Sequence, residues 1–147
     1  MEALYFLEGR NGGTLLKVST IMSLLDAKCF TKFQLDDEIE SAFACDLMSD
    51  VLAYVNQDIL LITGLAHVQT LRTAEMLDIK YIVFVRGKQP NQEMIELAKH
   101  HHMILLGTHL TMYEASGILY QEGLVGLQVW WNGRVAKWRI IYDLCLK

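Results

Sequence analysis

The fold is decided by three apolar segments: Ile59-Leu-Leu-Ile-Thr63, Tyr81-Ile-Val-Phe-Val85 and Met103-Ile-Leu-Leu-Gly107. They begin at residues 59, 81 and 103, so both intervals are 22 residues, and each is followed by a polar or glycine-containing turn and a helical pattern. Strands that alternate with helices in this way build parallel sheets, because each crossover helix lies on a face of the sheet. We predict an α/β fold of three layers, with a mainly parallel sheet built from repeated strand–loop–helix units.

The composition predicts one domain spanning residues 1–147, with a core at about 15–126 and a tail at 127–147. A chain of 147 residues can bury a full core without disulfides or metals. Its hydrophobic content of 52% is high, and an oligomer interface would account for part of it. The net charge of −4 comes without a basic stripe, which argues against a nucleic-acid partner.

The cellular location follows from the termini, the hydropathy and the cysteines. Cys29, Cys45 and Cys145 are odd in number and widely spaced, as in proteins whose thiols stay reduced. The first ten residues lack the basic leader of a signal peptide, and no run reaches the ~18 apolar residues of a membrane helix. We therefore expect a cytoplasmic protein with no membrane partner.

The flanking segments have their own patterns. Residues 39–45 alternate as one strand, and Ser19 is a plausible N-cap for a short helix that carries Ile21 and Leu25. Near the C-terminus, Asn132-Gly133 lies between two apolar segments, which is a strong signal for a β-hairpin extension. A short edge strand or a loose leader at 3–7 and a strand or short helix at 140–146 complete the predicted elements.

A ligand-binding site is expected where the three predicted strands end. In open parallel sheets, ligands bind beyond the carboxyl ends of the strands. The residues there are Thr63 and Gly64 after the first strand, Arg86, Gly87 and Lys88 after the second, and Thr108 and His109 after the third. Their amides, hydroxyls and cationic side chains suit a phosphate or carboxylate. The alternative is that the glycines only make tight turns and the cations are solvated.

Other polar clusters have simpler interpretations. Asp46, Ser49 and Asp50 form a pair of carboxylates with a hydroxyl, suited to a metal or to proton transfer, but capping of the helix that starts near residue 47 is the commoner role. The run His100-His-His102 cannot face one ion, because adjacent helical residues point about 100° apart. His67 and His109 lie in strand-end loops, but neither stands beside a nucleophile signature. No metal and no cofactor are predicted.

Four stretches resemble the DRTGG domain family: Asp46–Leu52, Ile62-Thr-Gly64 with Arg72-Thr-Ala74, Val85–Pro90, and Gly117–Tyr120 with Glu122-Gly-Leu124. The resemblance covers about residues 15–126, although no literal Asp-Arg-Thr-Gly-Gly string is present. Such domains resemble the central domain of long phosphotransacetylases and also occur beside CBS domains in some pyrophosphatases. The resemblance implies an α/β fold, a tendency to dimerise and a regulatory or ligand-sensing role.

Three functional hypotheses follow. The first is a non-catalytic, dimeric regulatory domain that binds a small anionic metabolite or nucleotide at the strand-end loops. The second is an assembly scaffold that uses Trp130, Trp131 and Trp138 as a contact surface. The third is an enzyme of phosphoryl or acyl-phosphate chemistry in which His109, Arg86 and Asp46 converge on one substrate. The absence of a GxxxxGK[ST] phosphate loop, a GxGxxG fingerprint, HExxH and GxSxG weighs against several large enzyme classes.

Overall fold

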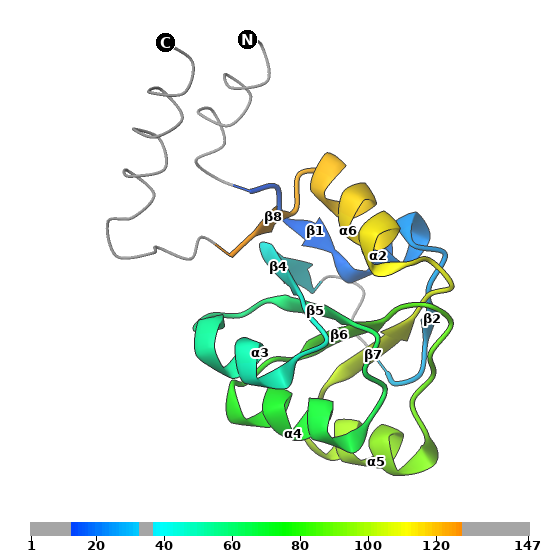
Figure 1. The fold of residues 1–147 in the computed structure, drawn as a ribbon. Helices are drawn as coiled ribbons and strands as arrows, with labels where there is room; N and C mark the ends of the chain where they lie inside the picture. Colours follow the sequence, from blue (N-terminus) through cyan, green and yellow to red (C-terminus); the bar gives the residue numbers. More distant parts are fainter. Residues whose placement is uncertain (1–12, 33–36, 128–147) are drawn as a thin grey trace, which may run out of the picture.

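The computed structural model describes residues 13–32 and 37–127. Its main element is a six-stranded sheet in the order β2-β7-β6-β5-β4-β8. Neighbouring strands from β7 to β8 run parallel, and β2 pairs antiparallel with β7 at one edge (Figure 1). The predicted α/β fold with a mainly parallel sheet is therefore confirmed. The predicted strand at 3–7, the hairpin with its three tryptophans and the segment 140–146 lie outside the described residues.

The three segments that decide the fold form the centre of the sheet. They are β5 (Leu60–Thr63), β6 (Tyr81–Phe84) and β7 (Ile104–Gly107). The other strands are β1 (Leu16–Lys17), β2 (Lys28–Cys29), β3 (Glu38–Ile39), β4 (Ser41–Ala44) and β8 (Val125–Gly126). The helices are α2 (Val18–Leu24), α3 (Met48–Tyr54), α4 (Val68–Met76), α5 (Gln92–His100) and α6 (Met112–Gln121).

Helices cover both faces of the sheet, which gives the three predicted layers. Along β5 and β6, Leu60, Ile62 and Val83 pack with α2 and α6, whereas Leu61 and Ile82 pack with α3, α4 and α5. Successive side chains of a strand point to opposite faces, so the apolar residues of these strands are buried only if helices pack on both faces of the sheet. Figure 1 shows α2 and α6 on one side of the sheet and α3, α4 and α5 on the other.

Several local predictions need correction. Residues 39–45 do not form one strand: β3 pairs with β1 in a separate two-stranded sheet, and β4 joins the main sheet. Ser19 is not an N-cap, because α2 starts at Val18 with Lys17 at the cap position. Pro90 lies just before the cap residue of α5, Asn91, whose side chain accepts a hydrogen bond from the Met94 amide. Gly123 follows α6 with a φ of 102°, a backbone conformation that favours glycine and ends the helix.

Within the described residues, no helix is both long and apolar enough to cross a membrane. Cys29 and Cys45, the two cysteines that the structure describes, are free thiols.

Candidate functional site

The parallel sheet brings the residues after β4, β5, β6 and β7 to one edge, which we call the carboxyl edge. β5, β6 and β7 are in direct register, so that Thr63 pairs with Phe84 and Phe84 with Gly107. Thr63, Arg86 and Thr108 therefore lie along the same side of the sheet, as their phasing predicted. The side chains at this edge fall into two groups with different surroundings.

The first group is a hydrogen-bonded cluster centred on Asp46. Asp46 Oδ1 accepts hydrogen bonds from the Thr63 hydroxyl at 3.0 Å and from the Gly64 amide, and Asp46 Oδ2 accepts one from Arg86 Nη2 at 2.9 Å. The Thr63 hydroxyl in turn accepts from the Leu65 amide at 3.2 Å. One carboxylate thus joins the ends of three parallel strands, β4, β5 and β6.

The predicted capping role of Asp46 is therefore wrong. The N-cap of α3 is Leu47, and no side chain caps this helix. The carboxylate points across the sheet edge instead, where buried donors on β5 and a cation from β6 offer stronger hydrogen bonds than one exposed helix turn. Ser49 and Asp50 lie in the first turn of α3, and none of the hydrogen bonds of the Asp46 cluster involves them.

The cluster also sets the ionisation of Asp46. Burial of the carboxyl acts to raise its pKa, but the Gly64 amide, the Arg86 and Thr63 side chains and the positive charge of Arg86 all favour the carboxylate. Their combined effect holds the pKa of Asp46 below its ordinary value of 3.8. Asp46 is therefore charged at neutral pH and neutralises Arg86.

Arg86 has a backbone conformation that is unfavourable for any residue with a Cβ atom. Its φ is 59°, in the left-handed region, and Gly87 follows with a φ of 68°. The Arg86 amide donates to the Leu110 carbonyl at 2.8 Å and the Gly87 amide to the Thr108 carbonyl at 2.9 Å, so the turn after β6 is bonded to the turn after β7. The guanidinium lies directly over Gly64: a Cβ there would be 1.8 Å from Arg86 Nη2. Gly64 thus provides the space that lets Arg86 reach Asp46.

This backbone conformation gives a testable stability difference. Arg86→Gly and Arg86→Ala both remove the ion pair with Asp46, but only alanine keeps a Cβ in the left-handed region. We expect Arg86→Gly to be more stable than Arg86→Ala by about 1 kcal/mol in urea unfolding. At Lys88, whose φ is not positive, the same pair serves as a control, and glycine should not be the more stable variant there. Equal stability of the two Arg86 variants would contradict the assigned backbone conformation.

The second group lines a cavity of about 90 Å³ between the turns after β6 and β7 and the edge strand β2. Gly87, Lys88, Thr108 and His109 from the predicted site line it, together with Lys28, whose ammonium lies 5.3 Å from the Phe30 ring centre. The other lining residues are Asp26, Phe30, Gln89 and Gly107. Among the described residues neither Lys28 nor Lys88 forms an ion pair.

Thr108 supports this cavity through the backbone. It is 3% exposed, and its hydroxyl donates to the Leu25 carbonyl at 2.6 Å and accepts from the Leu110 amide at 3.2 Å. These bonds tie the end of β7 to the end of α2. Because the Thr108 hydroxyl already forms these two hydrogen bonds within the protein, a ligand in the cavity would contact other atoms of the turn after β7.

The predicted ligand site is thus divided in two. Gly87, Lys88, Thr108 and His109 line the cavity, whereas Thr63, Gly64 and Arg86 belong to the Asp46 cluster. Lys28 could not be predicted as a site residue from the sequence, because β2 has only two residues and gives no periodic signal. The two-residue strand is held by pairing with β7, in which Lys28 lies opposite Gly107, a residue about 80 positions away in the sequence.

His67 and His101 make contacts within the fold. His67 is the N-cap of α4, where its Nδ1 accepts a hydrogen bond from the Gln69 amide at 3.2 Å. His101 Nε2 lies 3.4 Å from Glu75 Oε1, and the His100 and His101 rings are in edge contact. In the part of the chain that the structure describes, no group of three or more His, Cys, Asp or Glu side chains could hold a metal ion.

Comparison with known proteins adds a structural neighbour. No protein-family model matches this chain, and no curated protein sequence matches it significantly. A solved structure resembles it with a TM-score of 0.60: the CBS and DRTGG domains of the regulatory region of the Clostridium perfringens pyrophosphatase, complexed with the activator diadenosine tetraphosphate. The fold of this chain is DRTGG-like.

The limits of this likeness are set by identity and coverage. The two chains are 16% identical, and the match covers 74% of this chain and 47% of the pyrophosphatase region. This chain therefore spans about half of its structural neighbour. At this identity the likeness establishes the fold, and the function has to be argued from the site.

Proposed function

We propose that this chain is a non-catalytic regulatory domain that binds the phosphate or carboxylate group of a small metabolite or nucleotide at the carboxyl edge of its sheet. The observation that carries the proposal is the cavity of about 90 Å³ with Lys28, Lys88 and His109 in its wall. The cavity is several times larger than the smallest space that holds one water molecule, so it has room for a single small anionic group.

The charges around the cavity favour an anion. Lys28 comes from β2 and Lys88 from the turn after β6, so two separate elements contribute positive charge, against one carboxylate, Asp26. The Asp46 cluster next to it is neutral as a pair and holds the turn after β6 in place. A rigid turn lowers the entropic cost of ordering the site when a ligand binds.

A regulatory role fits better than catalysis. Asp46 and Arg86, proposed as parts of an enzyme site, are bonded to each other, and the hydroxyls of Thr63 and Thr108 are engaged within the fold. The structural neighbour belongs to a regulatory region that was solved with a nucleotide activator, which supports a ligand-sensing role here. A homodimer remains part of the proposal, and the exposed Leu47, Leu52 and Tyr54 around α3 offer an apolar surface for it.

Binding can be tested with orthophosphate, acetyl phosphate, AMP and ATP as probes in thermal unfolding. A probe present at about 100 times its dissociation constant should stabilise the domain by about 2.7 kcal/mol. The double variant Lys28→Gln/Lys88→Gln should weaken the binding of orthophosphate and acetyl phosphate by about tenfold or more, because both charges that face the cavity are removed.

The matched control is Arg72→Gln, which removes a positive charge from exposed α4 outside the cavity. It should leave the dissociation constant within about twofold, as expected for a remote surface substitution. If the double variant and the control bind every probe as well as the parent protein does, the carboxyl edge is not the binding site.

A further inference from the structure

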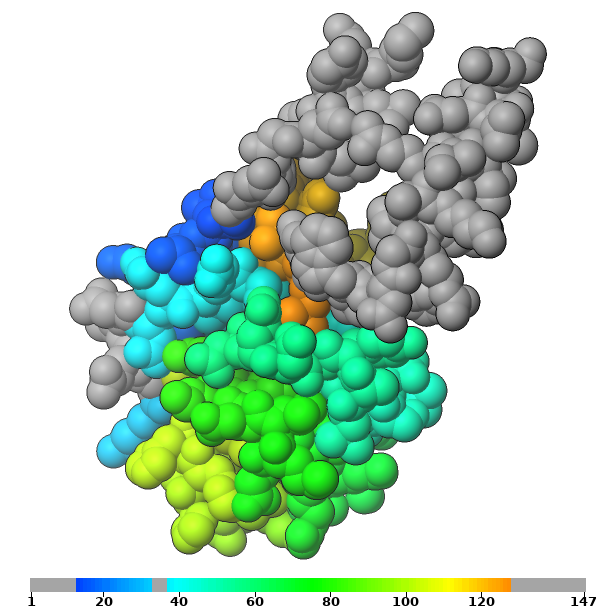
Figure 2. Space-filling view, turned by 90° about the vertical axis from the view of Figure 1, so that its left-hand side faces the viewer, coloured from blue at the N-terminus to red at the C-terminus, as the bar shows by residue number. Residues whose placement is uncertain are grey.

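A much larger hollow, of about 780 Å³, lies at the opposite end of the sheet. It is formed by the start of β6 and β7, the end of α5 and the segment that follows β2. Figure 2 looks onto this amino edge, where the pale-blue segment after β2 lies next to the yellow-green turn between α5 and β7. Its volume falls within the range of about 300–1,000 Å³ that is typical of small-molecule sites.

Basic side chains from three separate parts of the chain line this hollow. They are Lys32 after β2, Lys80 before β6, and Lys99 with His102 at the end of α5. The three lysines outnumber the single carboxylate of the lining, Asp37, in a protein whose net charge is −4. None of the three lysines forms an ion pair with another described residue. Positive charge is therefore concentrated here against the overall charge of the chain.

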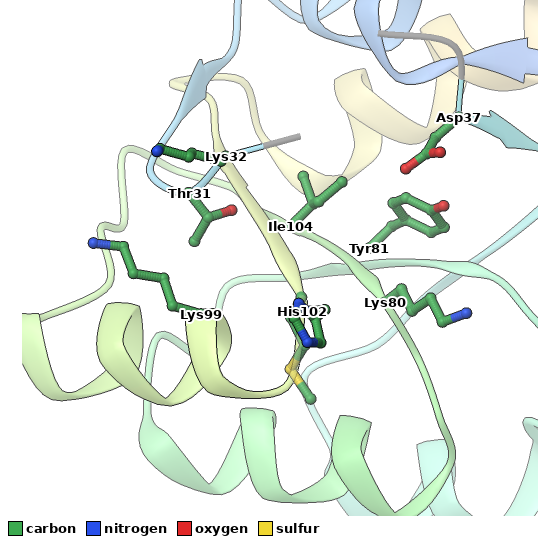
Figure 3. Close-up of a pocket in the computed structure, with 9 residues that line it drawn as sticks. Thr31, Lys32, Asp37, Lys80, Tyr81, Lys99, His102 and Ile104 are labelled. Atoms are coloured by element: carbon green, nitrogen blue, oxygen red, sulfur yellow. The ribbon is translucent and has the colours of Figure 1, made fainter. Parts of the chain in front are cut away.

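The close-up shows how these groups are arranged. In Figure 3 the Lys32 and Lys99 side chains extend toward the same side of the pocket with Thr31 between them, and His102 lies nearer the centre, beside the start of β7. Lys80 extends on the other side, near Tyr81 and Asp37. Ile104, which is 6% exposed, forms an apolar floor between these two sides, whereas the neighbouring Met103, which is 4% exposed, packs on the opposite face of the sheet. The pocket thus has a cationic end, an apolar floor and a polar end.

The turn that presents His102 is fixed by the end of α5. His102 has a φ of 56°, its amide donates to the Lys99 carbonyl at 3.3 Å, and the next amide, of Met103, donates to the Ala98 carbonyl at 2.8 Å. This bonding holds Lys99 and His102 at one end of the sheet whether or not the pocket is filled. A preformed cationic wall reduces the cost of binding a charged ligand.

We propose that this amino-edge pocket is a second binding site, for a phosphorylated small molecule that carries at least two negative charges and an organic body. Lys32 and Lys99, with His102 and the Thr31 hydroxyl, would take the phosphate groups, since a lysine ammonium binds phosphate oxygens as a point charge. The body would lie on Ile104 toward Tyr81 and Asp37, which offer hydrogen bonds to hydroxyl or amino groups. A lone phosphate would leave most of the hollow unfilled.

The test is an NMR titration of the protein with ATP, followed through the backbone amides. In the parent protein, saturable shifts are expected at residues 31–32 and 99–104. The double variant Lys32→Gln/Lys99→Gln should weaken this binding by about tenfold or more. Both lysines are exposed in the structure, so we expect the variant to fold.

Two controls separate this site from the carboxyl-edge site. Arg72→Gln removes a remote surface charge, and Lys28→Gln/Lys88→Gln removes the charges of the other cavity; both should leave the ATP-induced shifts at residues 99–104 within about twofold in affinity. Any one of three results would overturn the inference: no saturable shift at residues 99–104, unchanged ATP affinity in Lys32→Gln/Lys99→Gln, or an equal loss of ATP affinity in Arg72→Gln. None of these three results bears on the carboxyl-edge site, because binding there is measured separately, by the shifts of residues 87–89 on addition of orthophosphate.

Discussion

Replacing Asp46 by alanine is expected to lower the free energy of unfolding by about 2–4 kcal/mol. The substitution removes the acceptor of the Thr63 hydroxyl and the Gly64 amide, both on buried residues at the end of β5. A buried donor without a partner costs about 1–3 kcal/mol, and two are created. Urea unfolding of the parent protein and the variant at neutral pH measures the difference.

Asp46→Asn is the matched control, because an amide oxygen can still accept the bonds from Thr63 and Gly64. Asn loses the ion pair between residue 46 and Arg86. In the parent protein the side chains of Arg86 and Asp46 are 42% and 45% exposed, and such an exposed pair contributes about 0–1 kcal/mol. We therefore expect Asn to cost much less than Ala. Similar losses in the two variants would mean that the charge, and not the hydrogen bonds, carries the stability.

The ionisation of Asp46 predicts the direction of the pH dependence. Its pKa is lower in the folded protein than its ordinary value of 3.8, so the folded state favours the carboxylate. This contribution to stability is complete above the unfolded-state pKa and is lost as the pH falls through the lowered folded-state pKa. The difference in unfolding free energy between the parent protein and Asp46→Asn should shrink on acidification over this window.

Thr108→Val is the second substitution with a large expected effect, a loss of about 2–3 kcal/mol in unfolding free energy. Valine keeps the shape of threonine but can neither donate to the Leu25 carbonyl nor accept from the Leu110 amide. Both groups would then lack their side-chain partner next to a residue that is 3% exposed. Urea unfolding again provides the measurement.

Thr108→Ser tests the same bonds from the other direction. Serine keeps the hydroxyl and loses one methyl group, which costs about 1 kcal/mol at a buried position. It should be the more stable of the two variants. If valine proves more stable than serine, packing of the methyl group, and not the link between β7 and α2, is what Thr108 provides.

The central strands could be predicted from the sequence because each is a short apolar run followed by a turn signal. Leu60–Thr63, Tyr81–Phe84 and Ile104–Gly107 fall within the predicted segments, and their parallel alignment follows from the helices between them. Covering helices on both faces explain why these strands are continuously apolar. Local pattern and tertiary structure agree there.

The rest depends on contacts between distant residues. Asp46 stands at the end of β4 and just before α3, so its local sequence fits a cap, but its partners are Thr63, Gly64 and Arg86, up to 40 positions away. Lys28 and Lys32 reach their pockets only because β2 pairs with β7. Neither periodicity nor turn chemistry encodes such pairings.

The same limit applies to the boundary near residue 40. The alternation from Ile39 to Cys45 fits one strand, yet Glu38–Ile39 pairs with β1 and Ser41–Ala44 with β5. Ile39 packs in the core beneath α2 and α6, whereas Phe43 packs beside α3 on the opposite face of the sheet. The chain changes partner between the two halves, which a period of two cannot reveal.

Anion binding at the carboxyl edge can be measured by an NMR titration with orthophosphate, because the cavity there has room for one small anion. We expect saturable shifts of the amides of Lys28, Gly87, Lys88 and His109 in the parent protein, and much weaker binding in Lys28→Gln/Lys88→Gln. Amides around this cavity that stay unmoved at millimolar phosphate, or that shift equally in the double variant, would contradict the proposed binding site.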